Sequence, residues 1–121
     1  MTHVVIIDDS PTDLYVLQKI LERNGYQVST AKNAEEGLAL VKSVKPALVL
    51  MDVVMPGING FQATRQMSKD PETASIPVIM VTTKDQQTDR IWGMRQGAKE
   101  YLTKPVDEAK LLSVVKSVLG G

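Results

Sequence analysis

The chain alternates between short apolar segments and longer segments with helical spacing. The apolar segments are rich in β-branched residues and lie at His3–Ile7, Tyr26–Thr30, Ala47–Met51, Pro77–Val81 and Glu100–Thr103. A nearly continuous apolar run of this length predicts a strand buried on both faces, because a strand with one wet face would alternate. Strands that alternate with helices predict an α/β fold, in which five helices cover both faces of a five-stranded parallel sheet.

Apolar residues between these runs recur at the spacing of amphipathic helices. The clearest stripes are Leu14, Leu17, Ile20 and Leu21, then Leu38, Val41 and Val44, then Leu111, Leu112, Val115 and Leu119. Ser10 is expected to cap the start of the first helix, and Asn33 with Glu36 resembles a capping box for the second. Gly25 and Gly97 are expected just beyond the ends of the first and fourth helices.

Composition narrows the class of protein. The 121 residues suit one domain over 1–121, with no linker and no separate output domain expected. Fourteen basic residues balance fourteen acidic ones, which argues against a nucleic-acid partner. The absence of cysteine excludes disulfides and zinc-thiolate sites. No apolar run is long enough to span a membrane and the N-terminus lacks a basic signal region, so we expect a cytoplasmic protein.

Polar residues with chemical potential follow four of the apolar runs. They are Asp8 and Asp9, Asp52, Thr82 and Thr83, and Lys104 followed by Pro105. Because ligands bind outside the carboxyl ends of strands in open parallel sheets, we expect these residues to meet at one edge. Each has an ordinary explanation alone, such as an acid at a helix N-terminus or a solvated lysine before a turn. Their coincidence at one edge favours a site.

Three carboxylates packed together repel one another unless a cation lies among them. Because only oxygen ligands are available, magnesium or calcium is favoured over zinc or copper, and magnesium suits an incomplete cage that phosphate oxygens complete. A carboxylate can also act as a nucleophile toward phosphorus. Lys104 would supply a positive charge for a phosphoryl oxygen, and Thr82 a hydroxyl donor. The set therefore predicts phosphoryl transfer with Mg²⁺.

Four motifs carry a resemblance to a known family: IIDDSP, LVLMDVVMPGINGF, IPVIMVTTK and GAKEYLTKP. Together they resemble the receiver domain of two-component response regulators, the CheY-like fold, over the whole chain. The stretches GINGFQATRQ and TTKDQQTDRIWGMRQGAKEYLTKPVDE are similar to stand-alone receivers of pilus chemosensory systems, which act in twitching motility. The resemblance implies strand order 2-1-3-4-5, with the site at the switch point between strands 1 and 3.

The resemblance also implies roles for individual residues. Asp52 would accept a phosphoryl group from a CheA-like histidine kinase. Asp9 and Asp52 would bind magnesium directly with the carbonyl of Val54, while Asp8 acts partly through water. Lys104 would contact the phosphoryl group.

Further roles concern the switch. Thr82 would move toward the phosphoryl group and Tyr101 would follow it. The bond before Pro105 is typically cis in such domains.

Two positions depart from the commonest family pattern. The apolar Val54 cannot orient a water, which predicts slow dephosphorylation. Thr83, grouped with Thr82 among the phosphoryl-contacting residues, is larger than the alanine or glycine often found there and narrows access to the site.

The expected output is a changed surface rather than an enzyme product, over the fourth helix, fifth strand and fifth helix. The partner would be a protein such as a pilus motor or regulator, and we expect a monomer. We place Ile91 on the core stripe of the fourth helix, which leaves Trp92 partly exposed as a candidate contact residue. Trp92 could equally shield the sheet edge as a rim residue.

Several alternatives remain open at this point. The chain could drain phosphate from a shared kinase, or bind a partner independently of phosphorylation. A phosphatase of the haloacid dehalogenase type also uses an aspartyl nucleophile, but Val53 and Val54 replace its DxD motif after Asp52. A flavodoxin-like cofactor binder would need a phosphate-cradling loop, whereas the loop DDSPTD is acidic.

Overall fold

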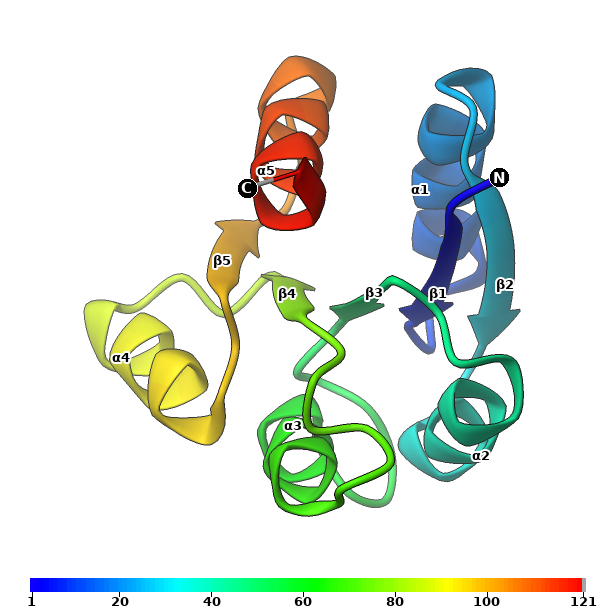
Figure 1. Ribbon diagram of the computed structural model, residues 1–121. Coiled ribbons are helices and arrows are strands. Elements are labelled where there is room, and N and C mark those ends of the chain that lie inside the picture. The colour runs from blue at the N-terminus through cyan, green and yellow to red at the C-terminus, as the bar shows by residue number, and fades with distance from the viewer. Residues whose placement is uncertain (121) are drawn as a thin grey trace.

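A computed structural model describes residues 1–120 and contains one parallel sheet with strand order β2-β1-β3-β4-β5 (Figure 1). The strands are β1 (His3–Ile7), β2 (Gln27–Ala31), β3 (Leu48–Met51), β4 (Val78–Thr82) and β5 (Glu100–Thr103). The helices are α1 (Pro11–Arg23), α2 (Ala34–Val44), α3 (Gly60–Lys69), α4 (Gln87–Gln96) and α5 (Glu108–Gly120). The expected fold class and strand order are therefore confirmed, with strand ends shifted by at most one residue.

The helices form two layers around the sheet. Helices α1 and α5 cover one face, whereas α2, α3 and α4 cover the other (Figure 1). Neighbouring residues of a strand point to opposite faces of the sheet. Strand β1 therefore supplies Val4 and Ile6 to the core beneath α1 and α5, and Val5 and Ile7 to the core beneath α2 and α3. None of the described helices is both long and apolar enough to cross a membrane.

The expected caps position the loops at the carboxyl edge of the sheet. The Ser10 hydroxyl accepts a hydrogen bond from the backbone N–H of Asp13 (3.2 Å), so α1 begins at Pro11, two residues after Asp9. Gly97 ends α4 with φ near +117°, a left-handed conformation that favours glycine. The chain therefore turns sharply from α4 toward β5, which carries Tyr101.

Helix α4 differs from the expectation. Its buried residues are Gly93 and Gln96, and Ile91 is 47% exposed, so placing Ile91 on a core stripe is wrong. The reason is a close approach of the helix backbone to the sheet: a Cβ atom on Gly93 would lie 3.0 Å from the Met80 sulfur. Helix α4 contacts the sheet through Gly93, and its large apolar side chains face outward. Trp92 is 50% exposed, as expected, although not for the expected reason.

Candidate functional site

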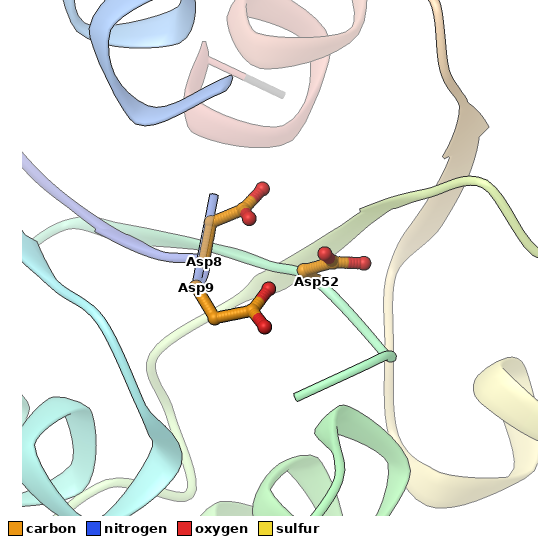
Figure 2. Close-up of side chains that lie close together, drawn as sticks. All are labelled: Asp8, Asp9 and Asp52. Carbon is orange, nitrogen blue, oxygen red and sulfur yellow. The ribbon is translucent and has the colours of Figure 1, made fainter. Parts of the chain in front are cut away.

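Three carboxylates gather where β1 and β3 end (Figure 2). The two strands are neighbours, and Ile7 pairs with Met51 in their register. The residues that follow, Asp8 and Asp52, therefore leave the sheet side by side. The backbone N–H of Asp52 donates to the carbonyl of Ile7 (2.9 Å), which fixes the chain just beyond the strand ends. Sequence spacing predicted this meeting of the acids.

The three carboxylates fit a hard divalent cation. One oxygen from each of Asp8, Asp9 and Asp52 lies within 4.8 Å of the others. Two oxygens on opposite sides of one Mg²⁺ lie about 4.2 Å apart, because each Mg–O distance is about 2.1 Å. Asp8 and Asp52 are buried and Asp9 is exposed, so the cluster opens to solvent on one side. An incomplete oxygen cage of this kind leaves positions for water or phosphate oxygens.

The ammonium group of Lys104 lies among the acids. Its Nζ donates to Asp8 Oδ2 (2.7 Å), to Asp13 Oδ2 (2.7 Å) and, over a longer distance, to Asp52 Oδ2 (3.3 Å). Sequence reasoning missed Asp13. The available signal was an acid in the first turn of the helix that starts at this edge, but nothing in the sequence indicated that it reaches a lysine 91 positions away.

The environment shifts the pKa values of this cluster. Burial raises the pKa of the Asp8 carboxyl, against the opposing effect of its hydrogen bonds from Lys104 and Ser10. Burial would lower the pKa of Lys104, but its hydrogen bonds to Asp13 and Asp8, with the charge of Asp52, raise the pKa above its usual value. Lys104 therefore stays positively charged throughout the physiological pH range.

The two carboxylate oxygens of Asp52 have different surroundings. Oδ1 accepts hydrogen bonds from the backbone N–H groups of Val53 (2.7 Å) and Val54 (3.4 Å), whereas Oδ2 faces Lys104. Gly60, the first residue of α3, packs against this loop, and a Cβ there would lie 2.0 Å from the backbone oxygen of Asp52. A side chain at residue 60 would displace Asp52, a constraint that the motif LVLMDVVMPGINGF does not reveal by itself.

Thr82 and Tyr101 contact the same backbone segment. The N–H of Lys84 donates to the hydroxyl of Thr82 (3.3 Å), and the hydroxyl of Tyr101 donates to the carbonyl of Lys84 (2.7 Å). Arg90 holds the tyrosine from outside, because its guanidinium lies 5.4 Å from the ring centre and donates to the Tyr101 carbonyl (3.1 Å). Burial raises the pKa of Tyr101 to about 12, so the hydroxyl keeps its proton.

The remaining candidate residues surround the acids. Thr83 and Val54 are exposed, and Val54 lines a shallow groove together with Phe61, Lys84 and Trp92. This groove places Trp92 beside the loop that follows Asp52. The peptide bond between Lys104 and Pro105 is cis, as the family resemblance implied.

Comparisons with known proteins agree with this geometry. The response regulator receiver domain family matches residues 4–116. The chain is 60% identical over its full 121 residues to the full length of the protein PilH from Pseudomonas aeruginosa.

Solved structures show the same fold. The chemotaxis protein CheY4 of Vibrio cholerae superimposes with a TM-score of 0.92 at 28% identity and covers 98% of this chain and 99% of its own. The receiver domain of the sensor histidine kinase PA1611 from Pseudomonas aeruginosa, crystallised with a magnesium ion in its active-site cleft, has a TM-score of 0.91. It is 24% identical and covers 99% of this chain and 98% of its own.

The family match covers almost the whole chain, and a relative of the same length is 60% identical to it, so the chain belongs to the response regulator receiver domain family.

Proposed function

We propose that this receiver is a phosphorylation-switched signalling module in which Asp52 accepts a phosphoryl group from a histidine kinase. One observation carries the proposal. Asp52 is a buried carboxylate with one oxygen on backbone N–H groups and the other 3.3 Å from Lys104, inside a cluster suited to a cation. These are the nucleophile, the positive charge and the metal ligands that phosphoryl transfer needs.

The transfer forms one bond and breaks another. An Asp52 oxygen attacks the phosphorus of a phosphohistidine, the new P–O bond forms, and the P–N bond breaks. The imidazole nitrogen leaves with the bonding electrons and takes up a proton, and the product is an acyl phosphate. Asp8, Asp9, Asp52 and the carbonyl of Val54 would hold Mg²⁺, which would neutralise charge on the phosphoryl oxygens when bound.

The protein's own groups stabilise the new charge. Lys104 contacts one phosphoryl oxygen with its ammonium group, and the hydroxyl of Thr82 donates to another, with Thr83 at the entrance. Because Thr82 and Tyr101 both bond to Lys84, a movement of Thr82 toward the phosphoryl group would disturb the tyrosine contact. A shift of two conformations from 1:99 to 99:1 needs about 5.5 kcal/mol of differential stabilisation.

The output in this proposal is the surface formed by α4, β5 and α5, with the half-exposed Trp92 as a contact residue. The 60% identity to PilH supports a role in pilus-based motility. The donor would be a CheA-like kinase and the target a protein such as a pilus motor or regulator. The proposal describes a cytoplasmic monomer that acts as a switch rather than an enzyme and needs neither nucleic acid nor membrane.

The proposal is tested by intact mass after incubation with acetyl phosphate and Mg²⁺. We expect the native chain to gain one phosphoryl group, dependent on Mg²⁺, and the Asp52→Asn variant to gain none. Asp85→Asn is the matched control, because Asp85 is an exposed acid outside the cluster. A folded native chain that gains no phosphoryl group from acetyl phosphate or from a phosphorylated kinase would contradict the proposal.

A further inference from the structure

The ammonium group of Lys104 has three N–H donors, and each faces a carboxylate. The contacts with Asp8 and Asp13 are short, at 2.7 Å, and the contact with Asp52 is longer, at 3.3 Å. The lysine side chain is only 11% exposed, so solvent offers little competition for these donors. The two short contacts therefore set the direction of the third donor.

Asp13 differs from the other two acids. Asp8 and Asp52 belong to the carboxylate cluster that can hold a cation, whereas Asp13 lies outside that cluster, on α1. A bound cation would be coordinated by Asp8 and Asp52, and a phosphoryl group would modify Asp52 itself. Of the three carboxylates that contact Lys104, Asp13 is the one that neither event alters.

The cap of α1 ties the two anchors of Lys104 together. The backbone N–H of Ser10 donates to Asp8 Oδ1 (2.9 Å), and the Ser10 hydroxyl accepts from the backbone N–H of Asp13 (3.2 Å). The first bond holds the Asp8 carboxylate itself, and the second fixes the backbone of Asp13 at the start of α1, from which its side chain reaches Lys104. A lysine side chain has four rotatable bonds and loses considerable conformational freedom when it is fixed, so two carboxylate contacts aim it more narrowly than one.

We propose that Asp13 is a positioning residue that aims the ammonium group of Lys104 at the phosphoryl group on Asp52. This inference rests on the proposed phosphoryl transfer. Charged hydrogen bonds of this length are directional and about twice as strong as neutral ones. Without Asp13 the ammonium group turns toward Asp8 and solvent, and its charge acts less fully where negative charge develops during transfer.

A purely structural role for Asp13 makes a different prediction. An acid in the first turn of a helix stabilises the helix through its dipole, wherever in that turn the charge lies. The double variant Thr12→Asp/Asp13→Ala keeps an acid in the first turn, because Thr12 is the neighbouring exposed residue, but removes the carboxylate that contacts Lys104. This variant separates the two roles.

The first measurement is the rate constant for phosphorylation by acetyl phosphate, followed by intact mass at saturating Mg²⁺. We expect Asp13→Ala and Thr12→Asp/Asp13→Ala to lower the rate constant equally, by roughly 3- to 10-fold. Asp13→Glu, which keeps the carboxylate, should recover most of the rate. Equal rates in the native and Asp13→Ala proteins, or recovery of the rate by Thr12→Asp, would overturn the proposal.

The second measurement does not depend on phosphorylation. Lysine ammonium groups held by short hydrogen bonds give ¹H–¹⁵N NMR signals, because their protons exchange slowly with water. We expect a signal from Lys104, assigned by its loss in Lys104→Met, that disappears in Asp13→Ala and persists in Asp13→Glu. A signal unchanged in Asp13→Ala would refute the positioning role, whether or not the chain takes up a phosphoryl group. Failure to take up a phosphoryl group would refute only the proposed function.

Discussion

Val54 lies two residues after the proposed phosphoacceptor, and its apolar side chain is 53% exposed at the mouth of the site. An isopropyl group cannot hydrogen-bond a water and hold it in line with the phosphorus. We therefore expect Val54→Asn to speed the loss of phosphate from Asp52 about 3- to 10-fold, a size typical of one positioned hydrogen bond. The measurement is the decay of the phosphorylated mass after acetyl phosphate is removed.

Ile91→Asn serves as the control for Val54→Asn, because Ile91 is similarly exposed but lies on α4. Its decay rate should equal that of the native protein. If Val54→Asn and the native protein lose phosphate at the same rate, the side chain at residue 54 does not limit hydrolysis, and the lifetime is set elsewhere in the site.

The site residues at strand ends could be predicted from sequence, whereas the contacts that Asp13 and Gly60 make from helices could not. Asp8 and Asp52 meet because neighbouring parallel strands end at one edge, which alternation of apolar runs is enough to suggest. Asp13 reaches Lys104 only because α1 and the loop after β5 dock together, and no local pattern encodes the distance between them. The approach of Gly60 to the Asp52 backbone is of the same kind.

At the scale of elements, α4 stands out because it buries no large apolar side chain of its own. It buries Gly93 and Gln96, whereas α3, which also has ten residues, buries Phe61 and Met67 among others. Few buried apolar contacts mean a low free energy of local opening. We expect the backbone amides of α4 to exchange with solvent at least 10-fold faster than those of α3, measured by hydrogen–deuterium exchange. Equal protection of both helices would show that α4 has stabilising contacts other than buried side chains.

The error over Ile91 has a physical cause at this scale. A hydrophobic stripe predicts the buried face of a helix that packs through side chains. Helix α4 packs through the backbone at Gly93, against Met80 and Tyr101, and such a contact leaves no apolar signature in the sequence. The same geometry leaves Trp92 available for a partner, which suits the proposed output surface.

At the scale of the whole molecule, Asp8, Asp9 and Asp52 gather in one cluster, and the ammonium group of Lys104 contacts Asp8 and Asp52 together with Asp13. Cation binding should relieve the repulsion within this cluster and stabilise the fold, by about 2.7 kcal/mol at a concentration 100 times the Kd. We expect Mg²⁺ to raise the melting temperature of the native protein and to have little effect on Asp8→Asn. Differential scanning fluorimetry with and without Mg²⁺ provides the measurement, and an equal rise in both proteins would place the cation elsewhere.

The pH dependence of this effect follows from Asp8. Because its pKa is raised in the folded protein, the folded state holds a proton that the unfolded state has lost as pH rises above 3.8. Without Mg²⁺, this group therefore makes the fold less stable as pH rises through that window. Mg²⁺ binds only the ionised carboxylate, so its stabilising effect should shrink as pH falls, beginning above pH 3.8. Melting temperatures across a pH series with and without Mg²⁺ measure this change.

The contact between Lys104 and Asp8 joins residues 96 positions apart. A ribosome must therefore synthesise most of the chain before the lysine and the acid can meet, and β5 must join the sheet before the contact forms. Nascent or partly unfolded chains contain Asp52 but lack the assembled charge around it. The proposed phosphoacceptor site can therefore assemble only after Lys104 has left the ribosome and β5 has joined the sheet.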